Sequence, residues 1–123
     1  MAHKETATAQ LAALWGDHGR AHLFLVTHHG SKFGSSDDLL AAITPRFAVI
    51  SVGATNTFGH PAPSTIARLR AQAAKTERIY CTATNGTVKA TISTSGAISW
   101  QATGQATPWW SRTGGQTGLC AGQ

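Results

Sequence analysis

Two short apolar runs separated by one helical pattern constrain the fold of this chain more than any other feature. The runs are HLFLVT (22–27) and RFAVISVG (46–53). Short runs rich in branched apolar residues are typical of strands that are buried on both faces of a layered α/β domain. If a right-handed crossover joins them, the loops that follow the two strands lie close together at one edge of a sheet.

Helical patterns lie before, between and after these two runs. Apolar residues at helical spacing predict a short amphipathic helix over 5–15. A second helix is predicted over 36–43, where serines can cap the start, aspartates suit the positive end of the helix dipole, and Pro45 ends it. A third helix begins at Pro63 and is expected to end near Lys75.

The C-terminal part of the chain predicts strands and then an irregular segment. RIYCTAT (78–84), the Asn85-Gly86 pair and TVKATIS (87–93) together predict a β-hairpin, because Asn-Gly accepts the positive φ angles of a tight turn. AISWQ (97–101) predicts a further short strand. We therefore expect one domain over 1–101 and a flexible tail over 102–123, rich in Gly, Thr and Gln, whose Trp109-Trp110 pair could dock elsewhere.

The charge balance and the hydropathy pattern exclude some classes of protein. Ten Lys and Arg against five Asp and Glu give a formal charge of +5, which attracts polyanions at low salt but also suits a mildly basic soluble protein. No apolar run approaches the roughly 18 to 20 residues of a membrane span, and the opening MAHKETATAQ lacks the apolar core of a secretory signal. A cytoplasmic location is the default expectation.

The two cysteines are far apart in the sequence. Cys81 lies in a predicted strand and Cys120 lies three residues from the end, so they form neither a Cys-x-x-Cys pair nor a dense disulfide framework. We expect two unbridged thiols, with a bridge between them as the alternative.

Three histidines follow the predicted buried strands. His28 and His29 end the first strand, and His60 lies in the turn-rich loop after the second. Imidazole is a common ligand of zinc and similar ions, and ligands at strand ends are held without much flexing. The alternative is that each is an ordinary loop residue or helix cap. Other ligand types are scarce. The only aspartates are Asp17, Asp37 and Asp38, and the sequence contains no His-x-His-x-Asp-His cluster.

Other polar residues suggest weaker possibilities. Ser31 follows His29 but lacks the Gly-x-Ser-x-Gly elbow of many serine hydrolases. Gly30, Ser31 and Lys32 could bind phosphate, although the P-loop pattern is absent. Cations and aromatic rings could form a nucleic-acid surface, or they could be a solvated helix face and core aromatics: Lys32, Arg68, Arg70, Arg78 and Arg112, with Phe33, Phe58, Trp109 and Trp110.

The ordered motifs also resemble those of a known family. The stretch HLFLVTHHGSKFGSSDDLLAAITPRFAVISVGATNTFGHPAPSTIARL closely resembles the C-terminal part of the metallo-β-lactamase-like domain of ComEC-type DNA-uptake (competence) proteins. The resemblance rests on the strand, HHGS, the following helix, the second strand, GHP and the helix after it. It extends from residue 22 to about residue 92.

The resemblance implies a fold class and a site. The family fold is an αββα sandwich of two similar halves with a metal site at the edge where they meet, and this chain is similar to the second half: a mixed sheet, flanking helices and a closing hairpin. His28 or His29 then corresponds to a metal ligand, while Ser31, Asn56 and His60 line the mouth of the site. The upstream ligand motifs are missing from this sequence, so we expect weak binding of zinc or manganese, with the catalytic residues unknown.

The resemblance leaves two functions open. The first is a fragment or truncated relative of a metal-dependent hydrolase, such as a nuclease or phosphodiesterase, with little turnover alone and an envelope association if it belongs to a full competence protein. The second is a non-enzymatic module that binds nucleic acid through Lys32, Arg68 and Arg70 or assembles with another subunit. A half sandwich exposes apolar sheet surface, so we expect a homodimer, a separate subunit or the missing half to cover it.

Overall fold

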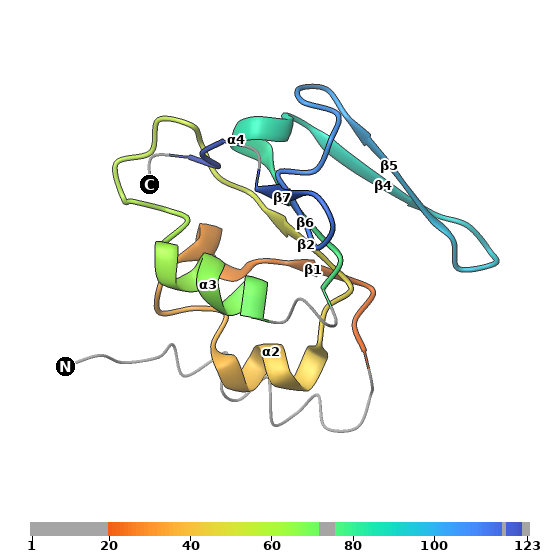
Figure 1. Ribbon diagram of the computed structural model, residues 1–123, viewed down its shortest axis with the longest axis horizontal. Helices are drawn as coiled ribbons and strands as arrows, with labels where there is room; N and C mark the ends of the chain where they lie inside the picture. The colour runs from red at the N-terminus through yellow and green to blue at the C-terminus, as the bar shows by residue number, and fades with distance from the viewer. Residues whose placement is uncertain (1–19, 72–75, 117, 122–123) are drawn as a thin grey trace.

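The computed structural model describes residues 20–71, 76–116 and 118–121. A five-stranded sheet has the order β1-β2-β3-β6-β7, and a separate two-stranded hairpin pairs β4 with β5. Two helices, α2 and α3, pack beside the sheet (Figure 1). The bounds in chain order are β1 Leu23–Leu25, α2 Asp37–Ile43, β2 Phe47–Ile50, α3 Pro63–Ala71, β3 Arg78–Cys81, α4 Thr82–Asn85, β4 Val88–Ile92, β5 Ile98–Ala102, β6 Trp110–Ser111 and β7 Gly115–Gln116.

The strand directions follow from the connections between them. β1, β2 and β3 are mutually parallel, with Leu23 opposite Phe47 and Ala48 opposite Ile79. The long connections through α2 and α3 allow this arrangement, since parallel strands need a crossover. β6 and β7 are joined to the sheet antiparallel. The prediction of a mixed α/β fold with flanking helices and a hairpin is confirmed at this level.

Helix α2 begins and ends where the sequence predicts. The Ser36 hydroxyl accepts a hydrogen bond from the backbone N–H of Leu39 at 3.3 Å, and Thr44 ends the helix in the left-handed region. α3 starts at Pro63 as expected. Its predicted end near Lys75 and the predicted helix over 5–15 lie outside the described residues. Within the part of the chain that is described, no helix is long and apolar enough to cross a membrane.

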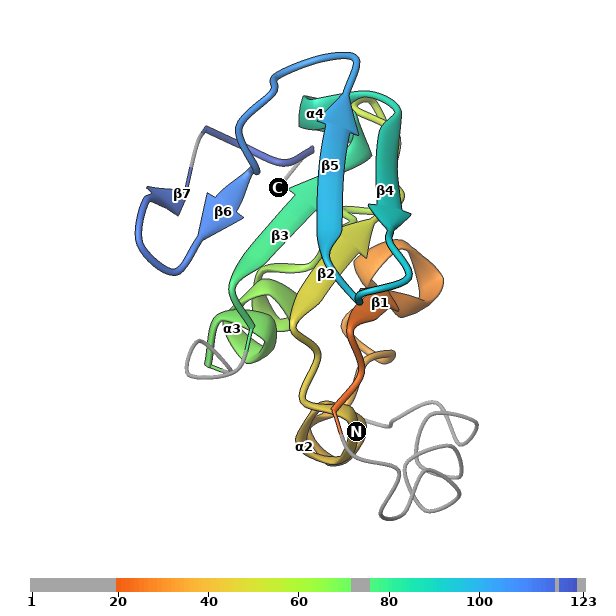
Figure 2. The same cartoon turned by 90° about the vertical axis from the view of Figure 1, so that its right-hand side faces the viewer.

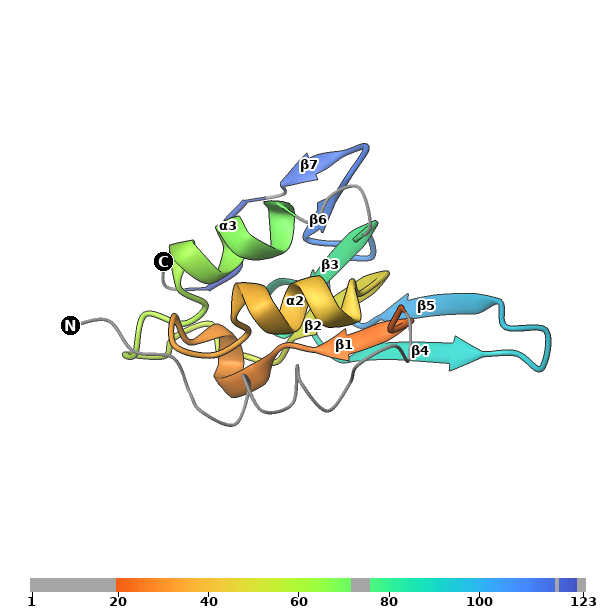
Figure 3. The same ribbon diagram turned by 90° about the horizontal axis from the view of Figure 1, so that it is seen from below.

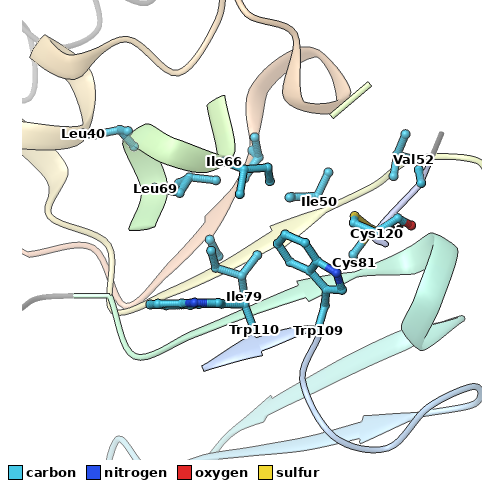
Figure 4. Packing of buried hydrophobic residues seen from close by; sticks show 13 residues of the cluster. Leu40, Ile50, Val52, Ile66, Leu69, Ile79, Cys81, Trp109, Trp110 and Cys120 are labelled. Carbon is cyan, nitrogen blue, oxygen red and sulfur yellow. Dashed lines mark hydrogen bonds between the residues drawn. A yellow bond between two sulfur atoms is a disulfide. The ribbon is translucent and has the colours of Figure 1, made fainter. Parts of the chain in front are cut away.

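The two faces of the sheet are covered by different elements. Ala48, Ile50 and Ile79 lie on the face that packs with the helices, in a buried cluster shown in Figure 4. Alternate residues of β2 and β3 face the hairpin instead, where the Trp100 ring stacks on Tyr80 with centroids 4.3 Å apart and meets Phe47 edge to face. Figures 2 and 3 show this hairpin on the side of the sheet away from α2 and α3.

The prediction that the first strand is buried on both faces is wrong. β1 is an edge strand, and its Leu23 and Leu25 side chains are 39% and 64% exposed. The hairpin covers Phe47 and Tyr80 but not these leucines, which flank Phe47 and Val49 in the register of the sheet. An apolar run at an edge has the same composition as a buried one, so the sequence pattern does not distinguish them.

The predicted hairpin at Asn85-Gly86 is also wrong. The Asn85 side chain is fully buried; it accepts from the backbone N–H of Cys81 at 2.9 Å and donates to the carbonyls of Gln105 and Thr107. These bonds stabilise the single helical turn α4, and Gly86 with φ 74° ends it. The hairpin forms one strand later, between β4 and the correctly predicted strand β5.

The C-terminal segment differs from the expected flexible tail. Trp109 is fully buried, its indole N–H donates to the Gly118 carbonyl at 3.1 Å, and Trp110 pairs with Ile79 of β3. Cys81 and Cys120 form a disulfide, which corrects the expectation of two unbridged thiols. The sequence pattern does not predict the pairing of Trp110 with Ile79 or of Cys120 with Cys81, because each joins this segment to a distant part of the chain.

Candidate functional site: two histidine loops at the sheet edge

The first histidine loop is a tight turn directly after β1. The turn η1 covers Thr27–Gly30, and three consecutive residues have positive φ: 50° at His28, 54° at His29 and 84° at Gly30. The backbone N–H of Ser31 closes the turn on the His28 carbonyl at 2.9 Å. Left-handed backbone costs a residue with a side chain about 1–2 kcal/mol and is concentrated at functional sites. This turn therefore marks a candidate site.

The second histidine loop follows β2 and is organised by Asn56. The Asn56 side-chain oxygen accepts from the backbone N–H groups of Phe58 and His60, both at 3.1 Å. Its amide N–H groups donate to the carbonyls of Gly53 at 2.9 Å and His60 at 2.8 Å. One side chain thus holds both ends of the loop and fixes the backbone that carries His60. The loop is yellow-green in Figure 1.

The two loops meet at Gly30 and Pro61. The backbone N–H of Ala62 donates to the Gly30 carbonyl at 2.8 Å, and the Thr65 hydroxyl donates to the Ser31 carbonyl at 2.9 Å. A Cβ atom on Gly30 would lie 2.5 Å from the Cβ of Pro61, a distance that atoms do not tolerate. Glycine at position 30 therefore allows the close approach of the loops.

This approach brings the predicted histidines together. The ring centroids of His28 and His60 are 5.5 Å apart, and those of His28 and His29 are 6.3 Å apart. His29 Nδ1 lies 2.6 Å from the Ser51 carbonyl oxygen. Because a carbonyl only accepts, Nδ1 carries the proton in neutral His29 and Nε2 presents its lone pair. Metal-binding histidines in proteins are commonly oriented by such a bond.

His60 lies in a partly buried position next to His28. Partial burial lowers the pKa of His60, and the neighbouring charges of His28 and then His29 lower it further. Its Nδ1 is buried and has no hydrogen-bond partner among the described residues. The lone pair of a neutral imidazole nitrogen can accept a hydrogen bond or bind a metal ion.

The donor chemistry suits a divalent metal ion, but the number of ligands does not. In residues 20–71, 76–116 and 118–121, no group of three or more His, Cys, Asp or Glu side chains is arranged to hold a metal ion. Protein zinc sites normally have three or four protein ligands. The described residues alone therefore do not complete a metal site.

Ser31 and Asn56 have structural positions at this edge. Ser31 is buried, and its hydroxyl accepts from the backbone N–H of Phe33 at 3.2 Å. Asn56 lines a depression of about 200 Å³ together with His29, Val52, Gly53, Phe58 and His60. Asn56 and His60 thus line the same depression, whereas the Ser31 hydroxyl bonds within its own loop.

The predicted basic surface is divided among separate contacts. Arg68 donates to the carbonyls of Lys32, Gly34 and Ser35 and so ties the loop before α2 to α3. The Lys32 ammonium lies 5.1 Å above the Phe33 ring. Arg70 contacts Gln116 at 3.3 Å and the Trp110 ring at 5.9 Å. The guanidinium of Arg68 therefore has a structural role, and the three cations are held in different local contacts.

Two parts of the site were not apparent from sequence reasoning. The Ser51 carbonyl that orients His29 is backbone, so no residue type signals it. The loop-organising role of Asn56 was also missed, although an Asn in a turn-rich loop that can bond its own backbone is a recognisable signal. Both features place side chains of the predicted site rather than adding new ones.

Comparison with known proteins supports one relationship. Competence protein ComA from Neisseria gonorrhoeae is 34% identical to this chain over 65 residues. The chain is similar to a competence protein. The matched region is 53% of this chain and 9% of that protein, so the chain matches a small part of its relative. No protein-family model matches the chain, and no solved structure matches it.

Proposed function

We propose that this chain is a fragment or truncated relative of a competence-type DNA-uptake protein, with its two histidine loops forming one side of a metal site in a nuclease or phosphodiesterase. The observation that carries the proposal is the apposition of His28 and His60, whose ring centroids are 5.5 Å apart, beside His29 with its Nε2 lone pair available. The partial similarity to ComA supports the same assignment.

In this proposal the chain supplies positioned imidazoles, and ligands from outside the described residues complete the site. His29 is oriented by Ser51, and His60 is held by Asn56. A bound divalent ion would supply Lewis-acid chemistry for phosphodiester hydrolysis. The half-sandwich architecture, the zinc or manganese ion and the nucleic-acid substrate all belong to the proposal. Because the ligand set is incomplete here, the isolated chain should show weak metal binding and little or no turnover.

The proposal predicts that zinc binding depends on the histidine turn. Replacing His28 and His29 together with alanine should weaken the zinc affinity of the chain by at least about tenfold, since even residues that only orient ligands change metal affinity by roughly 10- to 100-fold. Equilibrium dialysis with zinc and with manganese measures this change. A circular dichroism spectrum of the variant checks that the fold is retained.

His22→Ala is the matched control. His22 is exposed and precedes β1, so its removal should leave zinc affinity unchanged. Equal losses in His22→Ala and in the double variant would indicate nonspecific binding and contradict the proposed site. Robust nuclease turnover by the isolated chain would contradict the claim that further ligands are needed.

A second candidate function is assembly with another copy of this chain through β1. Among the described residues no strand pairs with the outer edge of β1, where Leu23 and Leu25 are exposed. Open strand edges with apolar side chains commonly pair with other chains. This arrangement favours a homodimer that extends the sheet and covers the exposed leucines.

The assembly candidate predicts a concentration-dependent dimer that Leu25→Lys disrupts. A lysine at the open edge would introduce a charge into the shared apolar surface, so the dimer dissociation constant should rise at least about tenfold. Sedimentation velocity over a range of concentrations measures the change. Leu119→Lys, at a leucine that is 66% exposed in the C-terminal segment, should leave association unchanged. A monomeric wild-type chain at high concentration would exclude this candidate.

A further inference from the structure

One aromatic ring of the second histidine loop projects into solvent beside the histidines. Phe58 is 78% exposed, but its ring lies nearly parallel to the His60 imidazole, with centroids 5.8 Å apart and an interplanar angle of 17°. Isolated exposed apolar side chains are ordinary on protein surfaces, so exposure alone does not indicate a function. The stacking on a histidine of the candidate site distinguishes Phe58 from the other exposed apolar residues.

The backbone of Phe58 is fixed in place. Its N–H donates to the Asn56 side-chain oxygen, which also accepts from His60. The same asparagine binds the loop at Gly53. Binding to a ring that is already positioned avoids much of the entropy cost of ordering a loop. Phe58 therefore combines an accessible face with a preorganised backbone.

The depression next to this ring is small and partly polar. Its volume is about 200 Å³, and Phe58, His60, His29 and Asn56 are among its lining residues. Sites for drug-sized ligands usually occupy roughly 300–1,000 Å³. The space beside Phe58 suits a single planar group that can stack on the phenyl ring and meet an imidazole.

We propose that Phe58 is a stacking platform for one base of single-stranded DNA at the mouth of the histidine site. This inference rests on the proposed function, because it takes nucleic acid as the ligand. Aromatic side chains bind bases of any sequence through their faces, while positive charge attracts the backbone; the chain carries a formal +5. Trp109 and Trp110 cannot serve this purpose because they are buried.

The test compares bases with a bare backbone. Binding of the full chain to labelled oligothymidylate of roughly 12 nucleotides, and to an abasic deoxyribose-phosphate oligomer of the same length, is measured by fluorescence anisotropy. Phe58→Ala should weaken oligothymidylate binding by about tenfold or more and leave abasic binding unchanged. Phe58→Tyr should retain wild-type affinity, because it keeps the aromatic face.

Ile92→Ala is the matched control for loss of an exposed apolar side chain. Ile92 is 57% exposed at the end of β4, and Figure 3 shows the turn of that hairpin at the opposite end of the molecule from the loop between β2 and α3. It should bind oligothymidylate like the wild type. Unchanged binding by Phe58→Ala would overturn the proposal, as would an equal loss on the abasic oligomer or no binding by the wild-type chain.

Zinc affinities of the wild-type chain and of the His28→Ala, His29→Ala variant, measured beside oligothymidylate binding by Phe58→Ala, separate this inference from the proposed metal site. Base binding that depends on Phe58 in a chain without zinc affinity would overturn the metal site and support the stacking platform. Zinc binding that depends on the histidine turn, with no effect of Phe58→Ala on oligothymidylate, would overturn the stacking platform alone.

Discussion

Replacing Cys81 and Cys120 together with alanine is expected to lower the free energy of unfolding by roughly 4 kcal/mol. The disulfide spans 39 residues of sequence, and a cross-link of that span removes about this much chain entropy from the unfolded state. Both cysteines are buried. Alanine suits these positions because its methyl side chain introduces no polar group that would need a partner. Urea denaturation followed by circular dichroism gives the change in unfolding free energy.

Denaturation of the wild-type chain and of the double variant in the presence of a reducing agent provides the control for this prediction. The reducing agent breaks the disulfide without changing the sequence. It should destabilise the wild-type chain by a similar amount and leave the double variant unchanged. Equal denaturation midpoints for wild type and variant would show that the bond does not form in the folded protein.

Trp109→Ala is expected to destabilise the fold by about 3–5 kcal/mol, the usual range for removing a large aromatic side chain from a core. Trp109 is fully buried in the cluster with Ile50, Ile79 and the disulfide (Figure 4). Its indole N–H also holds Gly118. Thermal or urea denaturation measures the loss.

Two further variants refine the interpretation of Trp109. Trp109→Phe keeps most of the buried aromatic surface but removes the hydrogen bond to Gly118. The lost hydrogen bond should cost about 1 kcal/mol, and the smaller ring adds a further loss of buried apolar surface. Leu119→Ala changes an exposed residue of the same segment and should stay within about 0.5 kcal/mol of wild type. If Trp109→Ala matched Leu119→Ala, residues 109–121 would be a loosely attached tail after all.

The elements predicted correctly are those whose signals are local. Helix α2 follows from a capping serine at Ser36, acidic residues in its first turn and Pro45 beyond its end. The start of α3 follows from Pro63, and strands β1, β2 and β5 follow from short apolar or alternating runs. Each of these signals involves residues within a few positions of one another.

The candidate site was predictable in its position but not in its geometry. A right-handed crossover between the two strands predicts that His28 and His60 lie at the same sheet edge, and their ring centroids are 5.5 Å apart in the structure. The orientation of His29 depends on the Ser51 carbonyl, and the stacking of Phe58 depends on the loop held by Asn56. Backbone acceptors and loop conformation leave little trace in residue identity.

Asn85 illustrates why the remaining predictions failed. Asn-Gly is a strong local hairpin signal, but the Asn85 side chain bonds Cys81, Gln105 and Thr107, two of them about twenty residues away. The hydrogen bonds of this buried amide outweigh the local turn preference, because breaking them would leave several buried polar groups without hydrogen-bond partners.

By itself, the sequence determined the α/β class, the crossover order of β1, α2, β2 and α3, and the strand-end position of the histidines, since capping, proline and apolar periodicity act over a few residues. Only the tertiary structure decided that β1 is an open edge, that Cys81 bonds Cys120 and that Trp109 is part of the core. These outcomes depend on which distant surfaces meet, and the burial free energy of such contacts is not encoded in any local pattern.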